Sequence, residues 1–69
     1  MIAKLTGTID EIGTDNIVLN VNGVGYLVFC SSRTIGAIGG KGDGATIYTE
    51  MQVSETDMRL MGFASGSER

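Results

Sequence analysis

The sequence has no histidine and only one cysteine, Cys30. Histidine is the usual general base at neutral pH and a frequent zinc ligand, so most acid–base and zinc chemistry lacks its main residue here. A lone cysteine cannot form a disulfide within the chain, and no histidine is present to activate it as a nucleophile. The carboxylates of Asp10, Glu11, Glu55 and Asp57 fall on expected exposed turns outside any apolar pocket. We therefore expect no catalytic residues, no metal and no cofactor in this chain.

Positive charge and long apolar runs are also scarce. The net charge is −3, and the five basic residues are dispersed: Lys4, Arg33, Lys41, Arg59 and Arg69. Nucleic-acid-binding proteins usually carry clustered basic residues, and five scattered cations can neutralise few phosphates. No segment is long and apolar enough to span a membrane, and the chain begins with a strand-like segment instead of a signal peptide. We expect a cytoplasmic protein without membrane contact.

Proline is absent, whereas 11 of the 69 residues are glycine and 42% are hydrophobic. This composition is typical of one compact, turn-rich β domain and not of a disordered segment. In a chain of this length, burial of apolar surface only roughly offsets the conformational entropy that folding removes. Support from a partner subunit or from further polypeptide is therefore an open alternative.

The dipeptide Asn22–Gly23 lies between two stretches of alternating hydrophobic residues. Asn-Gly in this setting is the strongest short-range hairpin signal, because a type I′ turn requires positive φ at both central residues. The predicted pairs are Ile17–Val28, Leu19–Tyr26 and Val21–Val24 on one face, and Asn16–Phe29, Val18–Leu27 and Asn20–Gly25 on the other. Cys30 then lies on the core face as a small buried hydrophobe. The outward residues Val18, Leu27 and Phe29 are expected to contact the helix after Cys30, another subunit or a missing domain.

A second hairpin is predicted from Ala45 to Phe63, closed by the polar segment Ser54–Glu55–Thr56–Asp57. The period-2 alternation predicts the pairs Val53–Met58 and Met51–Leu60 on one face, and Gln52–Arg59, Glu50–Met61 and Tyr48–Phe63 on the other. The acidic segment then lies at a solvent-exposed tip. Polar residues at such a tip need no functional explanation on chemical grounds alone.

The remaining segments complete a predicted barrel. A first strand over Met1–Ile12 is expected to be interrupted at Gly7 by a bulge or a tight bend. Ser31–Ser32 is expected to cap a short helix that runs to about Ile38. Three strands, a helix and two strands predict an all-β fold, a five-stranded OB-fold Greek-key barrel with one short helix between the third and fourth strands. An SH3-like barrel is the main alternative.

Three motifs in order resemble one known family. Met1–Ile2–x–x–Leu5–x–Gly7, Val21–x–Gly23–Val24–Gly25–Tyr26, and Val53 through Leu60–x–Gly62–Phe63 are similar to the amino-terminal domain of the RuvA family. RuvA is the bacterial subunit that binds Holliday junctions and works with the RuvB motor in branch migration. We expect residues 1–64 to form the OB-fold domain for junction binding and oligomerisation. Residues 65–69 are expected to begin a linker to a helix-hairpin-helix domain that this chain lacks.

The resemblance implies a division of work between domains. Four subunits form a homotetramer that holds four-way junction DNA open in a square-planar form. Most phosphate contacts come from the absent middle domain, the absent carboxy-terminal domain contacts RuvB, and the ATPase is RuvB itself. The hairpin between the last two strands carries an acidic pin that points at the junction centre. Glu55 matches the first pin residue, whereas Thr56 holds the second position, so that either Asp57 substitutes one residue later or Glu55 acts alone.

A different class of function is the main alternative to this one. A free-standing OB or SH3-like barrel could serve in protein interaction or in single-strand nucleic-acid binding, which uses aromatic platforms in a basic groove. Tyr48 and Phe63 are predicted to lie side by side on an outward face, but no basic residues gather around them in the sequence. Helix-hairpin-helix segments after Arg69 would distinguish the two functions.

Overall fold

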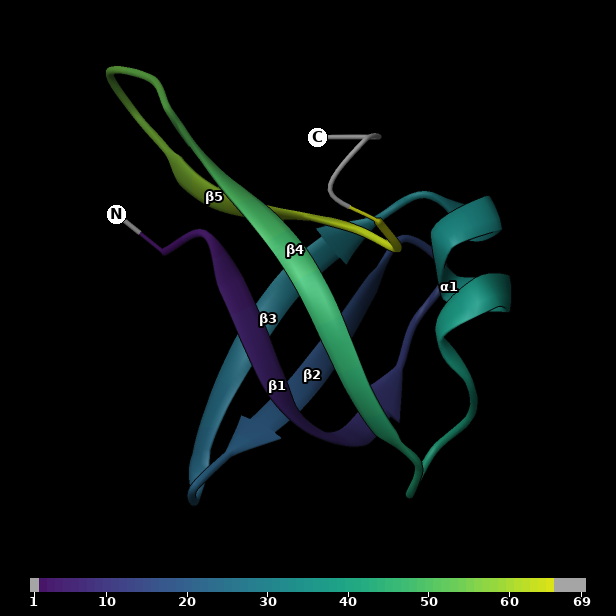
Figure 1. Cartoon of the computed structure of the whole chain (residues 1–69). Coiled ribbons are helices and arrows are strands. Elements are labelled where there is room, and N and C mark those ends of the chain that lie inside the picture. Colours follow the sequence, from purple (N-terminus) through teal and green to yellow (C-terminus); the bar gives the residue numbers. More distant parts are fainter. Residues whose placement is uncertain (1, 66–69) are drawn as a thin grey trace.

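The computed structural model describes residues 2–65, which form five strands and one short helix. In chain order these are β1 (Lys4–Ile12), β2 (Asn16–Val21), β3 (Val24–Cys30), α1 (Ser32–Ile38), β4 (Gly44–Val53) and β5 (Met58–Phe63). The strands close a barrel in the order β1–β2–β3–β5–β4, with α1 outside it (Figure 1). The predicted all-β OB fold, with its helix between the third and fourth strands, is confirmed.

The β2–β3 hairpin has the predicted register in all six pairs, from Asn16–Phe29 to Val21–Val24. Asn22 has φ 52° and Gly23 has φ 90°, as a type I′ turn requires. The turn is reinforced by the side chain of Asn20, whose Oδ1 accepts a hydrogen bond of 2.9 Å from the backbone N of Gly23. A local turn signal and a period-2 pattern therefore suffice to define this hairpin.

The core is made by inward side chains from all five strands, namely Leu5, Ile9, Ile17, Leu19, Val28, Cys30, Ile47 and Leu60. Burial raises the pKa of the Cys30 thiol to about 11, so the group is neutral at pH 7 and behaves as the buried hydrophobe that was predicted. Burial does not follow the alternation to the ends of the ribbons. Val24, Val53 and Met58 remain exposed because both hairpin ends extend past the barrel.

Strand β1 corrects two predictions. Asp10 and Glu11, expected on an exposed turn, lie inside the strand, and Asp10 Oδ2 accepts a hydrogen bond of 3.2 Å from Nδ2 of Asn20. The strand also lacks the expected interruption. It runs through Gly7 without a break, and its irregularity lies three residues later, between Ile9 and Glu11. Gly7 has another role, because β1 changes partner here: Lys4–Thr8 pairs with β4, and pairing with β2 begins at Thr8. A Cβ atom on Gly7 would lie 2.1 Å from the backbone oxygen of Asn20 in β2. The glycine is therefore required by a close approach of two backbones.

Helix α1 begins and ends as predicted. The Oγ of Ser31 accepts a hydrogen bond of 3.1 Å from the backbone N of Thr34, and Gly39 follows the last helical residue. Ile35 and Ile38 pack against the core, but the residue that is fully buried is Thr34, whose hydroxyl is bonded to Ser31 Oγ. The sequence pattern did not predict this inward threonine.

The outward patch Val18, Leu27 and Phe29 is only partly covered within this chain. Leu27 remains 51% exposed, and the other two residues are half-buried. Coverage by another subunit or domain stays a prediction, as does the domain boundary at residue 64. Four residues of the expected linker, 66–69, lie outside the described residues. Within residues 2–65, the structure contains no helix long and apolar enough to cross a membrane.

Candidate functional site

The acidic segment lies where the sequence predicted it, at the end of a ribbon made by β4 and β5. All five predicted pairs of this ribbon, from Tyr48–Phe63 to Val53–Met58, are present, together with a sixth pair, Thr49–Gly62. The ribbon extends beyond the barrel and away from α1 (Figure 1). Its loop is closed by the backbone N of Ser54, which donates to the backbone oxygen of Asp57 at 2.8 Å. The loop thus projects its polar side chains away from the core.

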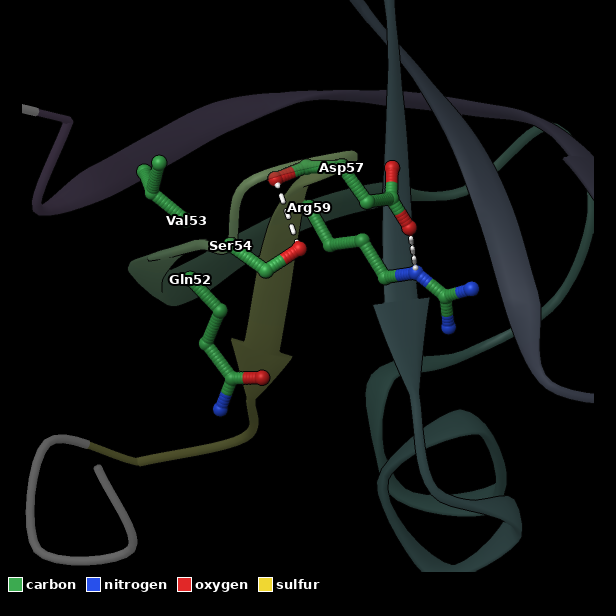
Figure 2. A pocket seen from close by; sticks show the side chains of 5 residues that line it. All are labelled: Gln52, Val53, Ser54, Asp57 and Arg59. Carbon is green, nitrogen blue, oxygen red and sulfur yellow. Dashed lines mark hydrogen bonds and ion pairs between the residues drawn. The ribbon is translucent and has the colours of Figure 1, made fainter.

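The carboxylate of Asp57 is held by two donors. Its Oδ1 accepts a hydrogen bond of 2.8 Å from the backbone N of Met58, and its Oδ2 accepts one of 2.6 Å from Nε of Arg59 (Figure 2). Both side chains of the ion pair are about half exposed, at 49% for Asp57 and 54% for Arg59. The hydrogen bond from Arg59, followed by that from Met58, holds the pKa of Asp57 below its ordinary value.

Arg59 also contacts β3. Its Cζ atom lies 4.9 Å from the centre of the Phe29 ring, within the range of a cation–π interaction. The guanidinium group therefore bridges Asp57 in the loop region and an aromatic ring of the barrel wall. Asp57 and Arg59 point to the same side of the ribbon, toward β3 (Figure 2).

Glu55 differs from Asp57 in the partners of its carboxylate. It is exposed at the tip, and none of the hydrogen bonds or ion pairs described for residues 2–65 involves its carboxylate. The structure thus brings both predicted pin residues to one loop but places them in different settings. Glu55 is a free charge at the tip, whereas Asp57 is paired at the base of the loop.

A shallow hollow of about 300 Å³ lies at this pair and is lined by Gln52, Val53, Ser54, Asp57 and Arg59. In the part of the chain that the structure describes, no three histidine, cysteine, aspartate or glutamate residues are grouped so as to hold a metal ion. The carboxylates of Glu55 and Asp57 and the guanidinium group of Arg59 can act through charge and hydrogen bonding at this exposed ribbon end.

Arg59 is the residue that sequence reasoning missed. It was treated only as one of five dispersed cations and as the partner of Gln52. Asp57 directly precedes β5, and residues two apart in extended backbone share a face, so the spacing of Asp57 and Arg59 was a usable signal. The contact between Arg59 and Phe29 could not be predicted from local sequence, because β3 and β5 are distant in the chain. These strands are neighbours only through the pairs Phe29–Met61 and Cys30–Gly62.

The ion pair can be tested by titration. We expect the carboxyl carbon of Asp57, followed by NMR, to titrate with a midpoint below the ordinary value of 3.8. A depressed pKa in the folded state contributes stability above the unfolded pKa, and this contribution is lost as the pH falls through the folded pKa. Arg59→Gln should raise the midpoint only partly, because the Met58 hydrogen bond remains. An unchanged midpoint in this variant would show that the pair does not form in solution.

Comparison with known proteins agrees with this architecture. A family model described as the RuvA N terminal domain matches residues 1–62. The chain is 61% identical to a protein of Erythrobacter litoralis, 59% identical to one of Novosphingobium aromaticivorans and 52% identical to one of Rhizobium meliloti. Each is named Holliday junction branch migration complex subunit RuvA, and each match covers 100% of this chain and 34% of the relative. The chain spans about a third of the length of these curated relatives, and it belongs to the RuvA amino-terminal domain family.

Proposed function

We propose that this domain is the junction-facing part of a DNA-binding subunit. The subunit binds four-way junctions as a tetramer and supports motor-driven branch migration in recombination and repair. One observation carries the proposal. In this chain, which belongs to the RuvA amino-terminal domain family, the loop that ends the projecting β4–β5 ribbon contains Glu55, whose exposed carboxylate has no described partner. The same proposal assigns the protein to the cytoplasm, where bacterial DNA is found.

The physical role of the tip is repulsion. A carboxylate near converging phosphates raises the energy of a collapsed crossover, and this repulsion is strongest where few ions screen it. Strands held apart in this way can be drawn through the junction by the motor. Glu55 suits this role because its charge is exposed and unpaired by any described residue.

The attraction that holds DNA must come from elsewhere. The chain has net charge −3, and affinity for DNA depends largely on cations that displace counterions from phosphates. We propose that a helix-hairpin-helix middle domain supplies most of these contacts and that a third domain contacts RuvB. The ATPase activity then belongs to RuvB and not to this subunit.

One titration tests the proposal. A four-way junction and a linear duplex of equal length are titrated in a gel-shift assay at physiological salt, with the full-length protein and with the 69-residue chain. We expect the full-length protein to prefer the junction and the 69-residue chain to bind either DNA weakly or not at all, since it has only five dispersed cations. A full-length protein without preference for the junction would overturn the proposed function. Tight junction binding by the 69 residues would overturn the division of work.

A further inference from the structure

The guanidinium group of Arg59 is oriented by two neighbours from different strands. Asp57 accepts from its Nε at 2.6 Å, and the ring of Phe29 lies 4.9 Å from its Cζ. A free arginine loses part of its rotamer entropy whenever it binds a ligand. Because Arg59 is already held at one edge and on one face, little further ordering is needed for it to bind.

The other edge of the same group is unused. Arginine has five N–H donors, of which Asp57 takes the one at Nε. The hydrogen bonds described for residues 2–65 include none from the Nη atoms of Arg59, and its side chain is 54% exposed. A planar pair of free donors matches two phosphate oxygens and can bind them through parallel hydrogen bonds.

The free donors of Arg59 lie close to the acidic tip of the ribbon. Arg59 pairs with Gln52 in the ribbon, and Glu55 follows Gln52 by three residues. At about 3.3 Å per residue of extended chain, the tip lies at most about 10 Å farther along the ribbon than the cation, since the chain turns back within the loop. The ribbon therefore carries a free negative charge in its loop and a pre-oriented cation in the second residue pair before that loop.

We propose that Arg59 binds a phosphate of the DNA backbone beside the junction centre and that Asp57 is the positioning residue that orients it. This inference rests on the proposed function, because it assumes that the ribbon faces junction DNA. Asp57 then has a different role from Glu55. One carboxylate repels phosphates at the tip, and the other holds an arginine that binds one.

The test measures the salt dependence of junction binding by the full-length protein. The slope of log K against log [salt] reports the number of phosphate contacts, at about 0.9 for each contact with duplex DNA. We expect Arg59→Gln to reduce the magnitude of this slope by about 0.9 for every Arg59 side chain in contact with DNA. Arg59→Lys should keep most of the slope, because the charge remains, but should bind more weakly because the fixed planar donors are lost.

Arg33→Gln is the matched control. It makes the same chemical change at an exposed position of α1, on the opposite side of the barrel from the acidic loop (Figure 1). We expect this variant to keep the original slope. An equal loss of slope in both variants would reduce the effect to net charge and overturn the inference. An unchanged slope in Arg59→Gln would give Arg59 a structural role only, and the junction preference of the unmodified protein would show that the proposed function still stands.

Discussion

Replacing Glu55 with glutamine in the full-length protein is expected to tighten junction binding and to impair ordered branch migration. The substitution removes a free charge from the tip without changing its size. Two unit charges 5–8 Å apart in water interact by about 0.5–0.8 kcal/mol, so each carboxylate removed should tighten binding by roughly two- to fourfold. In the proposed mechanism the same repulsion keeps strands separated, so its loss should slow or disorder strand exchange. Gel shift and a motor-driven branch-migration assay measure the two effects.

Asp57→Asn is the matched variant for this experiment. It also removes one negative charge, which favours binding, but it leaves Arg59 without the acceptor that orients it, which disfavours binding, so the net change in affinity should be smaller than in Glu55→Gln. Branch migration should be retained, since the tip carboxylate is unchanged. Loss of migration in Asp57→Asn as severe as in Glu55→Gln would show that both residues form the pin. Unchanged binding and migration in Glu55→Gln would show that the acidic loop is only a solvated turn with no role in either process.

Replacing Gly7 with alanine is expected to destabilise the barrel severely. The new Cβ would meet the backbone oxygen of Asn20 at 2.1 Å and its carbonyl carbon at 2.9 Å. A backbone cannot rotate away as a side chain can, so β1 and β2 would have to separate. Overpacking typically costs about 1–3 kcal/mol, and we expect a loss of at least 3 kcal/mol here. This is a large share of the roughly 3–10 kcal/mol typical of a chain of this length. Urea unfolding followed by circular dichroism measures the change.

Gly36→Ala provides the control for a glycine that is not required. A Cβ atom at Gly36 would meet nothing within 4 Å, and the residue lies inside α1. Alanine in a helix is favoured over glycine by about 1 kcal/mol, so this variant should be more stable than the original chain. A small loss in Gly7→Ala, comparable to that of an ordinary surface substitution, would show that the strands can separate there at little cost.

The two hairpins were predictable from sequence, pair by pair, because their information is local. Asn22–Gly23 defines the turn of one, and strict alternation on both sides of Ser54–Asp57 defines the register of the other. The function of Gly7 and the contact of Arg59 with Phe29 were not predictable in this way. Both arise where strands that are distant in sequence approach each other, and a single sequence contains no pattern that sets such distances. The sequence has Thr56 where the family has its second acidic residue, so the sequence alone left the role of Asp57 open. The structure shows that Asp57, unlike Glu55, forms an ion pair with Arg59.

The way the barrel closes has a mechanical consequence. Strands β3 and β5 are joined by only two parallel pairs, Phe29–Met61 and Cys30–Gly62, whereas β4 is joined to β1 by five antiparallel pairs. Parallel pairing is slightly weaker for each residue, so this short seam is where the ring opens at least cost. A load applied to the ribbon tip by moving DNA would reach the seam along β5. Arg59 lies on β5 and its guanidinium group contacts Phe29 on β3, so this contact adds to the two residue pairs that join these strands.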